Sequence, residues 1–362
     1  DTYRVLTAVD AALMVIDAAN GVEPQTRRLL QVCRARNTPI LTFVNKMDRE
    51  VQDPLVLMDE IERELGMTVV PFTWPVGMGK HFHGVMDLRK EQMRVFQPGE
   101  DRAAGEEEVL SGLANPAYAE RFGMQYEQAE GEIDLVREAA PVFDHAAFLQ
   151  GHQTPMFFGS AVNNFGVQEI LDALVDLAPA PGPRAAMQRT VEPDESKFTG
   201  VVFKIQANMD PAHRDRIAFL RVCSGRFERN KNYRHIRLGR EFKFPSPTMF
   251  MASKKTLLDD AYPGDVVGLY DSGNFKIGDT LTEGEILHFK GIPSFSPEQF
   301  RYVENADPLK QKQFAKGLEQ LMDEGVAQMF IRKSDGRRII GTVGQLQFEV
   351  IQHRLESEYN AK

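Results

Sequence analysis

Short apolar runs alternate with helical patterns over roughly the first half of the chain. Ala12 to Asp17 and Pro39 to Val44 are mostly apolar, as is typical of strands buried on both faces of a parallel sheet. A helix is predicted to begin near Pro24, because proline suits the first turn, and a second one runs from Pro54 until Gly66 stops it. The alternation of strand and helix predicts an open α/β sheet.

The alternation is interrupted at about residues 97–154, which are acidic at first and then helical in pattern. We expect this stretch to be a helical insertion, after which Pro155 to Phe158 returns as a strand and Val167 to Leu177 as a helix. The proline-rich run from Ala178 to Pro183 reads as a semi-rigid linker. A first domain is therefore predicted over residues 1–180.

Beyond the linker, the pattern changes from strand-and-helix alternation to short strands separated by turn residues. This pattern of short strands predicts a small β-barrel domain over residues 198–290. Residues 291–362 then show the order strand, helix, strand, strand, helix, which fits a partial ferredoxin-like α+β domain that stops before a closing strand. The strands expected for the barrel cover residues 198–206, 217–223, 233–238, 265–270 and 277–281.

The net charge limits the classes of binding partner, and the cysteine content indicates the cellular compartment. The 362 residues carry a net charge of −9, so binding to DNA through overall basicity is not expected. Cys33 and Cys223 lie far apart and form no disulfide framework, which favours a reducing, cytoplasmic setting. No apolar run approaches the roughly 18 residues of a membrane helix, and no membrane partner is expected.

Polar side chains follow the second predicted strand, at the edge where open parallel sheets bind ligands. They belong to the run Asn45-Lys46-Met47-Asp48. A carboxylate only accepts hydrogen bonds, so Asp48 can take the N1–H and the exocyclic N2–H of guanine, whereas adenine offers neither. Asn45 can donate to the base and tie neighbouring loops together, and the aliphatic stem of Lys46 can cover the base.

The turn Gly159-Ser160-Ala161 occupies the equivalent place after the strand that ends at Phe158. Its small residues allow backbone N–H groups to approach the guanine O6 closely. Taken alone, the tripeptide is equally typical of a tight turn between a strand and a helix with no binding role. Together the two loops predict a guanine site formed by Asn45, Lys46, Asp48, Ser160 and Ala161.

These motifs, with the barrel and the split βαβ domain, resemble the translational GTPases, which include elongation factor G and the ribosomal protection proteins. The bacterial family of peptide chain release factor three is the closer resemblance, and it covers the whole chain. Four runs carry it: Gly84 to Leu88, Phe203 to Pro211, His213 to Phe219, and Arg221 to Gly225. The resemblance implies a partial P-loop GTPase-type parallel sheet, then a translation-factor β-barrel, then the partial ferredoxin-like domain.

The resemblance also implies a function. The intact protein is expected to be a GTPase of bacterial translation termination, which uses GTP, GDP and Mg²⁺. Its partners would be the ribosome, through ribosomal RNA and proteins, and the decoding release factors whose recycling it promotes. Two alternatives are another ribosomal GTPase, such as elongation factor G or a ribosomal protection protein, and a non-enzymatic ribosome-binding module.

One departure from the family pattern limits what these residues can do. No G-x-x-x-x-G-K-[ST] motif occurs, since Gly77-Met-Gly79-Lys80 lacks the first glycine at the right spacing and His81 replaces the hydroxyl residue. The start of the chain resembles the segment just after the family's second switch. We therefore expect the catalytic and metal-binding residues upstream of Asp1 and residues 1–362 alone to be inactive, with Ala12 to Asp17 left as an exposed sheet edge.

A set of basic residues in the barrel has two readings. It is either an ordinary solvated face or a contact to phosphates of ribosomal RNA. Its members are Arg226, Arg229, Lys231, Arg234, Arg237 and Arg240.

Overall fold

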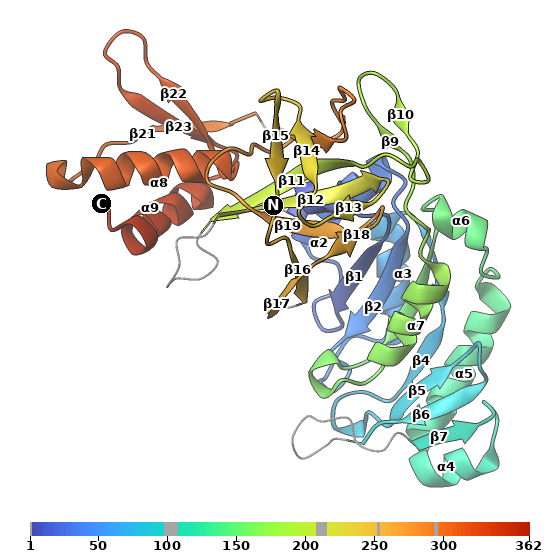
Figure 1. The fold of residues 1–362 in the computed structure, drawn as a ribbon. Helices are drawn as coiled ribbons and strands as arrows, with labels where there is room; N and C mark the ends of the chain where they lie inside the picture. The colour runs from blue at the N-terminus through green and yellow to red at the C-terminus, as the bar shows by residue number, and fades with distance from the viewer. Residues whose placement is uncertain (1, 98–107, 208–215, 252–253, 293–295) are drawn as a thin grey trace. The chain divides into compact units, whose positions relative to one another are not determined.

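The computed structural model describes residues 2–97, 108–207, 216–251, 254–292 and 296–362 (Figure 1). The chain forms two compact units, one from Asp10 to Ala180 and one that joins the segment up to Val9 with Pro181–Lys362. Among the helices of the described ranges, none has the length and apolar character needed to cross a bilayer.

The Asp10–Ala180 unit is built on a four-stranded parallel sheet in the order β1-β2-β8-β3. Helix α3 illustrates how local sequence sets its boundaries: the Asp53 side chain caps it by accepting from two backbone N–H groups, and Gly66 ends it with a φ of 56°. The parallel pairing of these four strands confirms the predicted α/β sheet. Its elements are β1 (Ala12–Asp17), α2 (Pro24–Ala35), β2 (Ile40–Asn45), α3 (Pro54–Leu65), β3 (Thr68–Pro71), β8 (Gln153–Phe158) and α7 (Val167–Leu177).

Strand β1 departs from the expectation that it is buried on both faces. It lies at the edge of the described sheet with β2 as its neighbour. The side chains of Leu13 and Val15, which point to one face, are 43% and 53% exposed, whereas Leu41 and Val44 of β2 are fully buried. The exposed apolar edge expected for this strand is therefore present.

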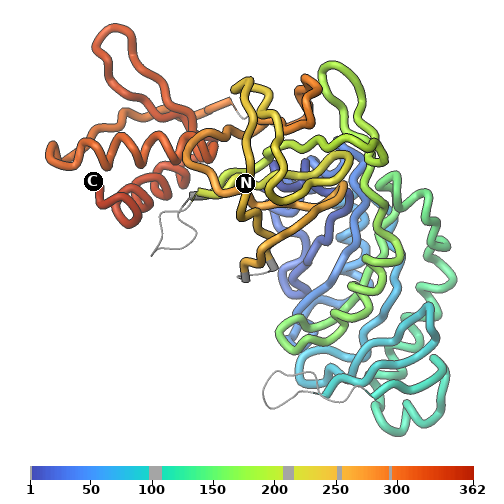
Figure 2. Tube along the Cα trace, viewed as in Figure 1, coloured from blue at the N-terminus to red at the C-terminus, as the bar shows by residue number. Residues whose placement is uncertain are grey.

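A second, antiparallel sheet lies between β3 and β8 in sequence, and the sequence pattern did not predict it. It consists of β4 (Thr73–Val76), β5 (Gly84–Asp87), β6 (Gln92–Val95) and β7 (Glu108–Ser111), paired in that order. The helices expected after it are α4 (Pro116–Phe122), α5 (Met124–Ala139) and α6 (His145–Leu149). Figure 2 traces this region from light blue to green.

Two contacts attach the inserted region to the main sheet. The Arg94 guanidinium of β6 forms an ion pair with Glu169 of α7, and both side chains are largely buried. Trp74 of β4 is fully buried, donates from Nε1 to Glu132 Oε2 of α5 at 2.9 Å, and packs edge-on against Phe158 of β8. The inserted sheet therefore reaches the carboxyl end of β8.

The acidic run at the start of the inserted region is only partly described. Glu108 begins β7, and its carboxylate pairs with the Arg121 guanidinium of α4 at 2.6 Å. Residues 106 and 107 lie outside the described residues. The described part of the run therefore forms an exposed ion pair.

The second unit contains an eight-stranded antiparallel sheet in the order β15-β14-β20-β11-β12-β19-β16-β17. The sheet curls around one core, because Tyr233 of β14 and Val267 of β19 belong to the same buried cluster. This confirms the barrel-like domain. Its strands are β11 (Thr199–Ala207), β12 (Arg216–Ser224), β14 (Asn232–His235), β15 (Arg240–Lys243), β16 (Thr248–Met251), β17 (Lys254–Leu257), β19 (Val266–Tyr270) and β20 (Thr280–Thr282).

Short elements complete this part of the chain. Two small antiparallel ribbons, β9 with β10 and β13 with β18, are each formed by two residue pairs. The first helix packs in the same unit, and its Arg4 donates to the carbonyl oxygens of Glu324 and Gly325 at 3.0 Å. The elements are α1 (Thr2–Leu6), β9 (Arg184–Ala185), β10 (Thr190–Val191), β13 (Phe227–Glu228) and β18 (Asp260–Ala261).

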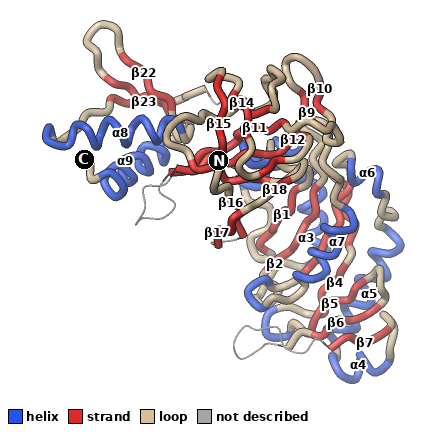
Figure 3. The backbone as a smooth tube through the Cα atoms, viewed as in Figure 1, coloured by secondary structure: helices blue, strands red, loops and turns tan. Residues whose placement is uncertain are grey.

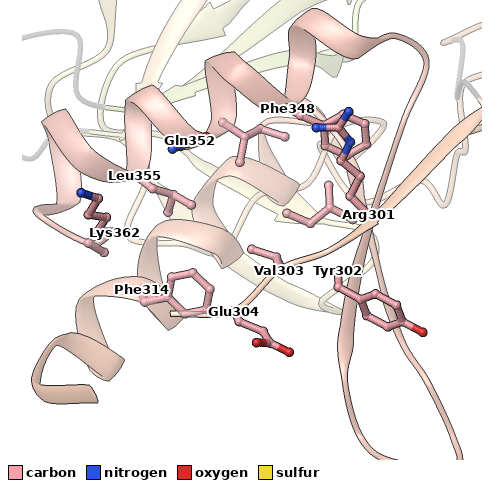
Figure 4. Close-up of a pocket in the computed structure, with 12 residues that line it drawn as sticks. Arg301, Tyr302, Val303, Glu304, Phe314, Phe348, Gln352, Leu355 and Lys362 are labelled. Carbon is pink, nitrogen blue, oxygen red and sulfur yellow. The ribbon is translucent and has the colours of Figure 1, made fainter. Parts of the chain in front are cut away.

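The carboxy-terminal part has the predicted order of strand, helix, strand, strand, helix. Its three strands pair in the order β21-β23-β22, as a split βαβ arrangement requires. Figure 3 shows the two helices on one side of this sheet, and a groove between them and β21 is drawn in Figure 4. The elements are β21 (Gln299–Tyr302), α8 (Gln311–Asp323), β22 (Gln328–Ile331), β23 (Arg338–Thr342) and α9 (Gln345–Tyr359).

A buried charged cluster closes the end of the barrel near β20. The carboxylate of Asp279 accepts from Arg237 Nε at 2.6 Å and from Lys276 N at 2.7 Å, and it lies 3.1 Å from His235 Nε2. Burial alone would raise the pKa of Asp279. The hydrogen bonds from Arg237 and His235 outweigh burial, so the pKa lies below its ordinary value.

This cluster predicts an acid-sensitive barrel. A carboxyl whose folded pKa is depressed stabilises the fold above its unfolded pKa of about 4, and this stability is lost as the pH falls further. Asp279→Asn should be less stable at neutral pH and should lose less stability between about pH 4 and pH 2. Urea unfolding followed by hydrogen exchange of β11 and β20 measures both. Asp194→Asn, at an exposed acid, is the control, and equal acid slopes for both variants would contradict the prediction.

Candidate nucleotide site

The carboxyl ends of β2 and β8 lie side by side. These strands pair in parallel with Val44 opposite Phe158, so the loops that follow them leave the sheet at the same edge. Backbone hydrogen bonds continue past the strands, from Gly159 N to Val44 O at 3.0 Å and from Met47 N to Gly159 O at 3.1 Å. The structure therefore brings together the two loops that carry all five predicted site residues.

Asn45 links the two loops through its side chain. Its Oδ1 accepts from the backbone N–H of Lys46 and from that of Ala161, each at 2.8 Å. Lys46 adopts a φ of 75°, a left-handed conformation that is rare for residues other than glycine. The asparagine thus fixes the tight turn after β2 and holds the β8 loop against it.

Asp48 is the end of a short chain of polar side chains. Asn163 Nδ2 donates to Ser160 Oγ at 2.7 Å, and the Ser160 hydroxyl donates to Asp48 Oδ1 at 2.5 Å. Ser160 is fully buried, while Asp48 is half-buried and open to a ligand. The hydroxyl aligns the carboxylate and leaves further lone pairs of Asp48 for other donors.

Lys46 is oriented by an acid at the end of the neighbouring strand. Its Nζ lies 2.5 Å from Oδ2 of Asp17, the last residue of β1. The hydrogen bond from Lys46 lowers the pKa of Asp17, so the carboxylate stays charged and holds the lysine. Asp17 sits directly opposite Asn45 in the parallel register.

The loop between β4 and β5 packs against both loops of the site. Its 3₁₀ turn η1 (Gly79–His81) begins at Gly79, whose N–H donates to Met47 O at 2.9 Å, and Met47 itself is buried. The next residue, Phe82, packs edge-on against Phe165, and Phe165 exchanges backbone hydrogen bonds with Ser160. This loop therefore contacts both parts of the site, although its Gly-Lys pair forms no phosphate-loop motif.

Gly159 is the residue that lets the β8 loop approach the sheet. A Cβ atom at this position would lie 2.8 Å from Phe43 Cζ and would also meet the carbonyl oxygen of Phe165. Any larger residue would push the loop away from β2. The close approach of the two loops therefore depends on this glycine.

Three supporting residues escaped the sequence reasoning. The sequence pattern marks Asp17 only as the end of an apolar strand. Asn163 lies outside the motif, and Phe82 lies in a hairpin that the pattern does not predict. A signal existed for Asp17, because the parallel strand order places its side chain beside Asn45. No comparable signal marks Asn163 or Phe82, whose roles depend on tertiary packing.

Comparison with known proteins defines the class to which this fold and site belong. Residues 1–180 match the family model described as the elongation factor Tu GTP binding domain, and residues 197–284 match elongation factor G domain 2. A solved structure from Thermus thermophilus superposes on the whole chain with a TM-score of 0.76 at 21% identity, and the match covers 54% of that structure. The chain is thus built like a GTP-binding translation factor.

The particular family follows from the remaining matches. Residues 289–362 match the model described as class II release factor RF3, C-terminal domain. The Bordetella avium protein named peptide chain release factor 3 is 62% identical over all of this chain and 68% of its own length. The Nitrosomonas eutropha protein of the same name is 61% identical over the same shares. The chain belongs to the peptide chain release factor 3 family, whose members are GTPases of translation termination.

The family-like runs fall on defined elements of the fold. The run from Gly84 to Leu88 contains β5. The run from Arg221 to Gly225 consists of the last residues of β12 and the glycine that follows them. The runs around residues 203–219 span β11 and β12, but their residues 208–215 lie outside the described part of the chain.

The Asn45 linkage leads to a stability prediction. Asn45→Ala removes the acceptor of the N–H groups of Lys46 and Ala161, which are part-buried and exposed, so each lost hydrogen bond should cost roughly 0.5–1.5 kcal/mol. Asn45→Asp keeps an acceptor oxygen and should stay closer to the original stability. Urea unfolding followed by the fluorescence of Trp74, the only tryptophan, measures the difference. Equal midpoints for the alanine variant and the original chain would show that the linkage contributes nothing.

Proposed function

We propose that the Asn45 and Ser160 loops bind the guanine base of GTP and GDP. Asp48 accepts from N1–H and N2–H of the base, and the stem of Lys46 covers one face of the ring. The observation that carries the proposal is the joining of the two loops by the Asn45–Ala161 and Ser160–Asp48 hydrogen bonds. These bonds hold an acceptor carboxylate and small-residue backbone donors at one sheet edge.

Base binding requires one exchange of partners in this proposal. The N–H of Ala161 donates to Asn45 Oδ1, and the guanine O6 would have to take this donor. Asn45 Oδ1 would keep the N–H of Lys46, and Asn45 Nδ2 would donate to another acceptor of the base. Ser160 stays on Asp48 throughout, because its hydroxyl uses one lone pair and the carboxylate has others free.

We propose that phosphate chemistry requires parts other than residues 1–362. Phosphoryl transfer depends on a phosphate loop, Mg²⁺ and a positioned water, and no phosphate-loop motif occurs in the sequence. The site residues fit the base, and within the described ranges no group of three or more His, Cys, Asp or Glu side chains is arranged to hold a metal ion. Mg²⁺ would therefore act in the intact protein, where it neutralises charge on the phosphates.

The cellular role we propose is that of the family. The intact protein binds the ribosome through RNA and protein and promotes recycling of the decoding release factors in a GTP-dependent cycle. Residues 1–180 act in nucleotide binding, with an insertion at about residues 97–154, and residues 198–290 and 291–362 act in docking. The names and identities of the relatives and the match of residues 289–362 support this role over that of elongation factor G.

Base choice provides the direct test. Asp48→Asn is made in residues 1–362 fused to the flanking segments of the Bordetella avium relative, here called the completed protein. The amide opposes the N2–H donor of guanine with its own donor, so GTP affinity should fall about tenfold or more. Xanthosine triphosphate, which carries an acceptor at that position, should gain affinity. Competition binding measures both nucleotides.

The control for base choice is Glu50→Gln, two residues along the same loop on an exposed side chain. It removes the same charge and should leave the preference for GTP intact. If Asp48→Asn and Glu50→Gln bind the two nucleotides alike, Asp48 does not contact the base.

A second prediction concerns residues 1–362 alone. They should neither hydrolyse GTP nor bind it tightly, because the base contacts cannot replace backbone and lysine contacts to the phosphates. Titration with fluorescent GTP and a turnover assay measure this, with the completed protein as the positive control. Sub-micromolar binding with Mg²⁺-dependent turnover by residues 1–362 would mean that a phosphate site lies within them.

A further inference from the structure

The carboxy-terminal sheet carries a cluster of aromatic side chains on its outer face. Tyr302, Ile339 and Phe330 stand opposite one another across the three strands, and Phe300 lies two residues from Tyr302 on the same face. Ile340, which points to the other face, is buried in the core with α8 and α9. The aromatic side chains therefore project away from the helices, and Phe300, Tyr302 and Phe330 are 57%, 50% and 40% exposed.

The rings of this face are arranged by the sheet beneath them. Phe300 and Phe330 meet edge to face with their centroids 5.7 Å apart. Gly341 lies opposite Phe300, and a Cβ there would come within 3.0 Å of the Phe300 ring, so the glycine lets the ring lie over the sheet. In Figure 4 the Tyr302 ring points away from the groove, whereas Arg301 turns toward Phe348 of α9.

Basic side chains border these rings. The Arg332 Nη1 donates to the Tyr302 hydroxyl at 2.6 Å, and the Arg337 guanidinium lies over the Tyr302 ring, 5.5 Å from its centroid. The hairpin between β22 and β23 and its flanks contain Arg332, Lys333, Arg337 and Arg338 against the single acid Asp335. Asp335 contacts both Arg332 and Arg337, yet the hairpin remains basic in a chain whose net charge is −9.

The basic set of the barrel differs from this hairpin. Four of its six members are paired with carboxylates: Arg226 with Asp260, Arg229 with Asp259, Lys231 with Glu228 and Glu283, and Arg237 with Asp279. These pairs compensate most of the positive charge of the set, and Arg240 donates to the neutral side chain of Asn274. The hairpin, with four basic residues and one acid, is the better candidate for a contact to phosphates.

We propose that this outer face, which we call the Tyr302 face, binds unpaired bases of an RNA loop. It is defined by Phe300, Tyr302 and Phe330. Exposed aromatic rings on an antiparallel sheet offer stacking surfaces to bases, and guanidinium groups add stacking and cation–π contacts. The basic hairpin meets the adjoining phosphates. The proposal rests on the proposed ribosome docking and names unpaired ribosomal RNA as the partner of this domain.

The first experiment measures binding of residues 1–362 to a fluorescein-labelled, single-stranded RNA of mixed sequence by anisotropy. The double substitution Tyr302→Leu with Phe330→Leu removes two stacking surfaces but keeps apolar side chains, so affinity should fall about tenfold or more. The matched control is Tyr262→Leu in the barrel, an equally exposed tyrosine with the Arg226 guanidinium over its ring. This control should bind as the original chain does.

Salt dependence separates stacking from charge. Arg332→Gln with Arg337→Gln should flatten the decline of affinity with salt, because each phosphate contact contributes to the slope. The leucine variant should lower affinity at every salt concentration and leave the slope unchanged. Thermal unfolding of all variants checks that the domain remains folded.

Two outcomes overturn the proposal. One is RNA binding by the leucine variant that equals that of the Tyr262→Leu control. The other is cross-linking of the Tyr302 face to ribosomal proteins and not to RNA when the completed protein is mixed with ribosomes, which would assign the face to a protein partner. If the completed protein fails to bind ribosomes while residues 1–362 still bind RNA through this face, the docking role fails and the RNA surface stands.

Discussion

The parallel pairing of β2 with β8 is the constraint on which the nucleotide site depends. Buried hydroxyl groups fix its register: Thr42 Oγ1 lies 2.8 Å from Thr154 Oγ1, and the Thr154 hydroxyl also reaches Ile40 O at 2.8 Å. A slip by one residue would leave these hydroxyls unpaired in the core and turn apolar side chains outward. The register in turn sets where the Asn45 and Gly159 loops leave the sheet, so the site follows from the strand pairing.

The inserted hairpin gives the site a second support that is independent of this pairing. The main sheet fixes the loops at their origins, whereas Gly79 and Phe82 contact them beyond the strands. Trp74 and the buried Arg94–Glu169 ion pair attach the hairpin to β8 and α7. Removing one partner of such a buried pair would leave the other charge buried and uncompensated, which is costly. Residues outside the two motif loops therefore also hold these loops in place.

Sequence reasoning succeeded where local pattern and strand order suffice. The parallel sheet, the barrel-like domain, the split βαβ order and the two motif loops all follow from apolar runs and turn residues. It failed for β4 to β7, because these short strands lie in a stretch without clear alternation. It also treated β1 as buried on both faces, because an apolar run does not reveal that the side chains of Leu13 and Val15 are exposed on one face; the open edge itself was expected only from the family resemblance. Asn163 and Phe82 could not be found, because only tertiary packing brings them to the site.

The left-handed backbone of Lys46 has a consequence for engineering and for selection. A residue other than glycine in this conformation costs roughly 1–2 kcal/mol, and glycine would adopt it freely. The lysine at this turn therefore carries a conformational cost that glycine would not, and its side chain forms the ion pair with Asp17. Placing glycine here to relieve backbone strain, a common way to stabilise a protein, would also remove the hydrogen bond from Lys46 to Asp17. At this turn, backbone strain and a side-chain contact therefore have opposite effects on stability.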